Sequence, residues 1–148
     1  MKSNTIRIFA FLFALSLAGC ATTASVPPAG MAAENNITFP VTVEKVWYRT
    51  DKVRQLELAL AYEDVGTITI NENTVEFVSK KGKISIPGKS IEKISWEKLS
   101  PDVSNTWVVV HYTGSGTDNV AAFKGALYSD PAKDGKIFSA IRRIMKSE

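Results

Sequence analysis

Three polar residues that lie close together in the sequence, His111, Ser115 and Asp118, are of the types that form a nucleophilic triad. A triad needs the histidine hydrogen-bonded to the nucleophile and oriented by the acid on a rigid scaffold. Ser115 stands between two glycines in an expected turn, Gly114-Ser115-Gly116, which gives the hydroxyl no such support. We therefore predict a surface histidine and no catalytic residues.

Metal ligands are scarce in this sequence. Zinc usually takes three or four ligands from His and Cys side chains, and the chain has one of each, His111 and Cys20. A single cysteine also excludes an intrachain disulfide framework. We expect no metal site and no cofactor.

Lysines crowd one stretch of the chain, at positions Lys80, Lys81, Lys83, Lys89, Lys93 and Lys98. One hypothesis is that Lys80, Lys81 and Lys83 contact an anionic surface, such as lipid headgroups, lipopolysaccharide or a cell-wall polymer. The other is a solvated hairpin whose charged edges resist sheet-to-sheet pairing. Lysine on an exposed turn is ordinary, so the second interpretation is preferred and the first stays open.

Aromatic residues recur at strand and helix spacing, which is more typical of a packed core than of a ligand groove. They include Trp47, Trp96, Trp107, Tyr48, Tyr62 and Tyr112. Trp107 is the main candidate for an exception to packing, because it shares a strand face with Val109 and His111, opposite to the face of Val108 and Val110. One of these faces must be covered by a helix or by a partner.

The N-terminus has the order of a secretory signal. Lys2 and Arg7 precede an apolar run from Ile8 to Leu17, and small residues lead to Cys20. A membrane-spanning helix needs roughly 17 to 25 apolar residues, and this run ends sooner, at Thr22-Thr23. The run is therefore expected to be a signal peptide over residues 1–19 and not a span.

The residues Leu17-Ala18-Gly19-Cys20 resemble the lipobox of bacterial lipoproteins. The resemblance implies cleavage between Gly19 and Cys20 and acylation of the Cys20 thiol, with palmitate among the attached chains. Ala21, in place of the aspartate that favours inner-membrane retention, implies an outer-membrane lipoprotein facing the periplasm. The alternative is cleavage after Ala24 or Ala33, which would discard Cys20.

Removal of the signal changes the charge balance. The 18 basic residues fall to 16 without Lys2 and Arg7, against 15 acidic ones. A mature chain so close to neutral gives no electrostatic support for a nucleic-acid partner. Residues 20–36 are small and polar, typical of a flexible tether of about 20–25 Å, and residues 37–148 form one domain.

Hydrophobic spacing predicts the elements of that domain. Val43, Val46, Trp47, Thr50 and Val53 recur every three or four residues, which predicts a short N-terminal helix capped by Thr42. Alternation predicts strands over 56–60, 67–70, 74–78, 84–86, 91–96, 107–112 and 120–123, separated by turns. The three-residue spacing of Ile91 and Ile94 predicts either a bulge or a later start of this strand. Asp130-Pro131 begins an amphipathic helix that reaches Lys146.

The expected fold class is mainly β (α+β): a small curved antiparallel sheet or partly open barrel with a C-terminal helix. The order resembles the pleckstrin-homology-like fold, including its GRAM-type members, and the residues that carry the likeness are Gly66–Ile70, Val75–Phe77, Lys83–Pro87, Ser90–Ile94 and Pro131–Lys146. The chain departs from that family by its N-terminal helix. It also lacks a basic signature in the first strand-to-strand turn, where phosphoinositide binders place theirs.

These patterns predict a lipid-anchored envelope protein with a non-enzymatic binding or scaffold domain. Its partners would be the membrane, through the anchor, and an envelope protein or anionic envelope component. The competing hypotheses are an envelope enzyme or transport accessory with a pocket between sheet and helix, and a module in which Lys80, Lys81 and Lys83 bind an anionic surface.

Overall fold

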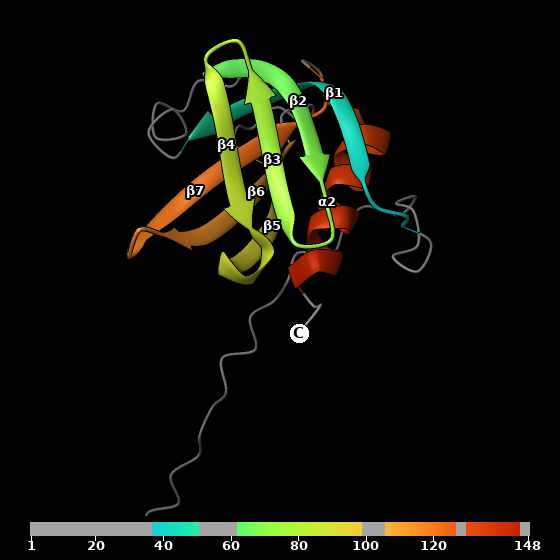
Figure 1. Ribbon diagram of the computed structural model, residues 1–148. Coiled ribbons are helices and arrows are strands. Elements are labelled where there is room, and N and C mark those ends of the chain that lie inside the picture. The colour runs from blue at the N-terminus through green and yellow to red at the C-terminus, as the bar shows by residue number, and fades with distance from the viewer. Residues whose placement is uncertain (1–36, 51–61, 99–105, 127–129, 146–148) are drawn as a thin grey trace, which may run out of the picture.

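The computed structural model describes residues 37–50, 62–98, 106–126 and 130–145 (Figure 1). Seven strands and one α-helix make up this part of the chain. They are β1 (Val41–Thr50), β2 (Asp64–Ile70), β3 (Thr74–Ser79), β4 (Gly82–Pro87), β5 (Ile91–Lys98), β6 (Thr106–Gly114), β7 (Thr117–Lys124) and α2 (Pro131–Met145), with a short 3-10 turn at Gly88–Ser90. Among these residues no helix combines the length and the apolar character that a membrane crossing requires.

The strands form one antiparallel sheet in the order β4-β3-β2-β1-β7-β6-β5. Figure 1 shows it strongly curved, so that β2, β3 and β4 lie in front of β5, β6 and β7. The prediction of a mainly β fold with a curved antiparallel sheet and a C-terminal helix is confirmed. β6 is an interior strand, paired with β5 on one side and β7 on the other.

The local turn predictions are confirmed as well. β2 and β3 form a hairpin in which the Asn71 amide donates to the Thr74 carbonyl over 2.9 Å. The turn from β3 to β4 ends at Gly82, whose φ of 147° favours glycine. The register of β5 shifts between Ile91 and Lys93, which is a bulge, the first of the two expected alternatives.

The core lies on one face of the sheet, where all seven strands contribute apolar side chains. α2 covers this face, because Ile137, Ala140 and Ile141 are fully buried among them. The side chains of Val108 and Val110 belong to this core, whereas Trp107 and Val109 form a second cluster with Ala122 on the opposite face. The predicted division of this strand into two apolar faces is therefore confirmed.

The predicted N-terminal helix is wrong over Thr42–Thr50, because this segment lies within β1. Lys45 has a φ of 57°, and the pairing with β2 shifts register between Val43 and Val46. A bulge adds one residue to a strand, so two inward side chains that would be two residues apart become three apart. The helical spacing of Val43 and Val46 is thus the signature of a bulged strand.

Other predictions lie outside the described residues. They are the signal peptide over 1–19 with its cleavage at Gly19 and Cys20, the tether over 20–36, the end of the N-terminal helix at Val53, and the strand over 56–60.

Candidate functional site

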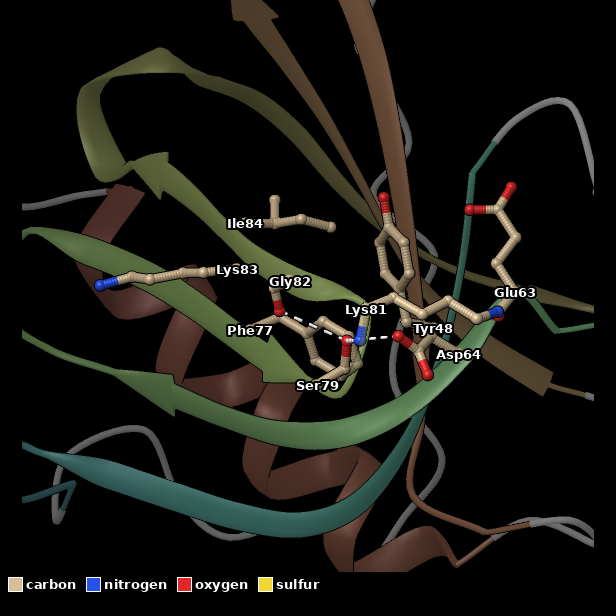
Figure 2. Close-up of a pocket in the computed structure, with 9 residues that line it drawn as sticks. All are labelled: Tyr48, Glu63, Asp64, Phe77, Ser79, Lys81, Gly82, Lys83 and Ile84. Atoms are coloured by element: carbon tan, nitrogen blue, oxygen red, sulfur yellow. Dashed lines mark hydrogen bonds between the residues drawn. The ribbon is translucent and has the colours of Figure 1, made fainter.

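A cavity of about 200 Å³ opens at one end of β1–β4 and is the candidate binding site. Antiparallel pairing brings the end of β1, the start of β2, the end of β3 and the start of β4 to this edge. We call this cavity the mouth pocket; its lining residues are Tyr48, Glu63, Asp64, Phe77, Ser79, Lys81, Gly82, Lys83 and Ile84 (Figure 2).

The floor of the mouth pocket is apolar. The rings of Tyr48 and Phe77 stack with centroids 5.0 Å apart, and Phe123 lies 5.7 Å from Tyr48 behind the floor. Burial, with smaller contributions from the charge of Glu63 and from Tyr112, raises the pKa of Tyr48 from 10.0 to about 12. The Tyr48 phenol therefore stays neutral and acts as an aromatic wall.

Two carboxylates from the start of β2 form one part of the rim. Thr50 donates its hydroxyl to Glu63, and Ser79 donates its hydroxyl to Asp64. The Val65 amide also donates to Asp64 Oδ1 over 2.9 Å. Chiefly through the Ser79 hydrogen bond, the pKa of Asp64 lies below its usual value of 3.8. Asp64 is thus held as an anion at neutral pH.

Lysines of the β3–β4 turn and of β4 form the other part of the rim. Lys81 and Lys83 both line the pocket, and Lys80 is exposed on the same turn. The Lys81 ammonium donates to the Glu63 carbonyl, and Lys83 pairs with Glu76 at 2.7 Å. The structure therefore places two of the three lysines singled out from the sequence in the lining, of which Lys81 lies next to Glu63 and Asp64.

Sequence reasoning missed the acidic residues, and it named Tyr48 only among the aromatic residues for which core packing was preferred to a ligand groove. Asp64 lies 15 residues before its partner Ser79, so only the register of β2 and β3 joins them. Tyr48 stands in the segment predicted as a helix. An alternating pattern restarted after a bulge at Lys45 would have placed Val46 and Tyr48 on one inward face.

The structure places His111 beside a glutamate of β5. His111 Nε2 lies 3.8 Å from Glu97 Oε1 on β5, and Ser95 donates to the same oxygen over 2.7 Å. Ser115 is exposed at the tip of the β6–β7 turn. It follows His111 by four residues, which corresponds to about 13 Å along an extended strand. The side chain of Asp118 lies outside the description.

Within the part of the chain that the structure describes, no three His, Cys, Asp or Glu side chains are grouped so that they could hold a metal ion. Cys20, the expected lipidation site, lies outside these residues.

The aromatic residue Trp107 lies close to two cations on the face of the sheet opposite to the core. The Arg49 guanidinium is 4.7 Å from the ring centroid of Trp107, and the Lys124 ammonium is 5.6 Å from it. Both basic side chains are buried, and a cation over an indole face is stabilised by the ring quadrupole. Trp107, the main candidate for an exception to the packing role expected of the aromatic residues, is completely buried.

Comparisons with known proteins give evidence on the fold alone. No protein-family model matches the sequence, and no curated protein matches it. Among solved structures, a chain of "The 8S snRNP Assembly Intermediate" is similar, with a TM-score of 0.50 and 13% identity over 82% of this chain and 87% of that chain. Similarity at this identity concerns the arrangement of the backbone and not its ligands.

Proposed function

We propose that the protein is a lipid-anchored component of a bacterial cell envelope, with a pleckstrin-homology-like, non-enzymatic binding domain. The observation that carries this proposal is Cys20, which ends an apolar run of signal-peptide length behind small residues. Several acyl chains on this residue would hold the protein stably, because each buried methylene contributes about 0.8 kcal/mol. The outer membrane, facing the periplasm, is the proposed location because Ala21 follows the cysteine.

The fold supports the assignment of the domain. Seven antiparallel strands with a C-terminal helix over one face are the arrangement that the sequence resemblance implied. The strands carrying the resemblance are β2 to β5, and the helix is α2. The partly open barrel of the pleckstrin-homology-like fold is the finer form that we propose for this curved sheet.

The chemistry of the mouth pocket supports binding more than catalysis. An efficient general acid or base has a pKa near the working pH. The pKa values of Tyr48 and Asp64 are shifted away from neutral pH, because the pKa of the phenol is raised and that of the carboxyl is lowered. The nine lining residues include no histidine and no cysteine. Asp64 is therefore suited to hold a fixed negative charge against a ligand, and Tyr48 to provide a neutral ring.

The main alternative is recognition of an anionic surface by Lys80, Lys81 and Lys83. It is favoured by their exposure on one turn and at the adjoining start of β4. The domain begins near the β2–β3 turn, because the start of β1 pairs with the end of β2. The six residues of β3 separate that turn from the lysine-bearing turn by about 20 Å, and the proposed tether can span the same distance. The lysines could therefore reach the anchoring membrane.

The second alternative, an enzyme or transport accessory with a pocket between sheet and helix, receives less support. Where α2 meets the sheet, Ile137 and Ile141 are fully buried, and Trp96 packs edge-on against Phe138 at 6.0 Å. The mouth pocket lies at the strand ends instead.

The test of the anchor is Cys20→Ser in the full chain, with Thr22→Ser as the matched control. We expect the unmodified chain and Thr22→Ser to incorporate radioactive palmitate and to sediment with outer membranes, and Cys20→Ser to do neither. Intact mass should place the mature N-terminus at an acylated Cys20. A native chain that begins after residue 20 and carries no hydrocarbon contradicts the proposal.

A further inference from the structure

The lining of the mouth pocket combines one apolar floor with rim charges of both signs. We propose that it binds a small zwitterion: a molecule in which a short apolar group carries one ammonium and one carboxylate, as in an aromatic amino acid. This inference rests on the proposed function, because it names the ligand class of that same binding domain.

The charge balance of the rim argues against a ligand that is only anionic. Two of the charged lining residues, Lys81 and Lys83, are basic and two, Glu63 and Asp64, are acidic. Lys83 is already paired with Glu76, so Lys81 is the lysine that faces the two carboxylates. Like charges brought together across an interface are unfavourable, and a phosphate on Lys81 would lie close to the two carboxylates. A ligand with both signs of charge avoids this repulsion.

The carboxylates are fixed in position by donors from the protein. Thr50 donates to Glu63, and the Ser79 hydroxyl and the Val65 amide donate to Asp64. A side chain already held in place loses less conformational entropy when a ligand binds. This pair is therefore an acceptor for an ammonium group.

The two signs of charge come from different elements around the floor. Figure 2 shows Lys83 on one side of the Phe77 ring and Glu63 and Asp64 on the other, with the Lys81 side chain reaching across toward Glu63. Lys83 points away from these two carboxylates and pairs with Glu76, so a zwitterion would place its ammonium near Asp64 and its carboxylate near the Lys81 ammonium. The two contacts together fix the orientation of the ligand.

The floor and the volume limit the apolar part. Tyr48 and Phe77 present stacked rings, and Ile84 adds an aliphatic wall. Offset or edge-to-face contact with such rings favours an aromatic or a branched aliphatic group. At about 200 Å³ the cavity is smaller than the roughly 300–1,000 Å³ of sites that enclose drug-sized ligands. The ligand is therefore of amino-acid size, or is the end of a longer molecule.

The test compares the binding of four probes to the full chain in mild detergent. Binding is measured by the NMR shifts of the Gly82 and Phe77 amides. The probes are L-phenylalanine, 3-phenylpropionate without the ammonium, 2-phenylethylamine without the carboxylate, and inorganic pyrophosphate. We expect L-phenylalanine to bind about two- to fivefold more tightly than either half-molecule, since an exposed ion pair contributes up to about fivefold. Pyrophosphate should bind more weakly still.

Variants assign the binding to the rim. Asp64→Asn and Lys81→Gln should each weaken the binding of L-phenylalanine about two- to fivefold. Lys89→Gln, outside the lining, should leave this affinity unchanged. Lys83→Gln is the second basic variant, and thermal unfolding checks that each variant is folded. The proposal is overturned if 3-phenylpropionate or pyrophosphate binds as tightly as L-phenylalanine, or if L-phenylalanine moves neither amide.

The two proposals fail separately. The anchor is scored by palmitate, intact mass and sedimentation, and the zwitterion by amide shifts. A chain that is acylated at Cys20 but does not respond to L-phenylalanine refutes only the ligand class.

Discussion

Ser79 at the end of β3 donates its hydroxyl to the carboxylate of Asp64 at the start of β2, and this hydrogen bond joins two strand ends at the rim of the mouth pocket. The same Ser79 oxygen accepts the Lys81 amide over 3.1 Å. One serine thus positions both the acidic and the basic part of the rim.

Ser79→Ala should raise the pKa of Asp64 toward its usual value, because the Ser79 hydrogen bond is the largest cause of the lowered pKa. A carboxyl group whose pKa is lower in the folded state stabilises the fold at pH values above its unfolded-state pKa. This stability is lost as the pH falls through the folded-state pKa. The variant should therefore show a weaker loss of stability in acid. The measurement is the ¹³C carboxyl shift of Asp64 against pH.

Ser85→Ala, at an exposed position of β4, is the matched control and should leave the Asp64 titration unchanged. An Asp64 midpoint that is the same in Ser79→Ala and in the unmodified protein would show that this hydrogen bond does not hold the carboxylate.

Tyr48 should make the protein sensitive to alkali. Its pKa is raised from 10.0 to about 12, so between these values the unfolded chain loses the phenolic proton while the folded chain keeps it. Stability present below pH 10 is then lost as the pH rises toward 12, by up to roughly 3 kcal/mol. Tyr48→Phe keeps the ring stack and should remove this part of the loss.

Urea unfolding at pH 9 and pH 11.5 measures the effect. Tyr62→Phe, whose side chain is exposed, should show the same alkaline loss as the unmodified protein. Equal losses in Tyr48→Phe and Tyr62→Phe would contradict a buried, neutral Tyr48.

Local signals in the sequence predicted most of the fold. The polar turn at Asn71–Asn73 predicted the hairpin of β2 and β3, and Asp130-Pro131 predicted the start of α2. Each signal lies within a few residues of the element that it specifies. The mouth pocket was predicted only in part, because the lysines are adjacent in sequence whereas Asp64 and Tyr48 reach them through strand register.

The failure at β1 has one physical cause. Val43 and Val46 are both buried and three residues apart, which is helical spacing, but Lys45 lies in the left-handed region at φ 57°. Such a conformation is unusual for lysine, so no residue type marked the bulge. The true strand alternation resumes only at Val46 and Tyr48.

Lys45→Gly should be neutral or stabilising, by up to about 1 kcal/mol. The left-handed conformation costs a non-glycine residue about 1–2 kcal/mol, which exceeds the roughly 0.5–1 kcal/mol that glycine loses in chain entropy. Lys83→Gly in β4 provides a comparison, because its backbone φ is not positive and it should lose about 0.5–1 kcal/mol. Urea unfolding midpoints measure both. Equal destabilisation of the two variants would count against a strained bulge.

Ile141→Ala should destabilise the domain by about 2–5 kcal/mol, because it removes a fully buried side chain of α2 and leaves a cavity over the sheet. Lys136→Ala, at an exposed position of the same helix, should change stability by less than about 0.5 kcal/mol. The difference in urea midpoint between the two variants isolates helix packing from helix propensity. If both variants unfold at the same midpoint, α2 does not cover the core. In the other case, Ile141→Ala alone lowers the urea midpoint and L-phenylalanine still shifts the Gly82 amide of that variant. This result would show that the packing of α2 and the mouth pocket are energetically separate.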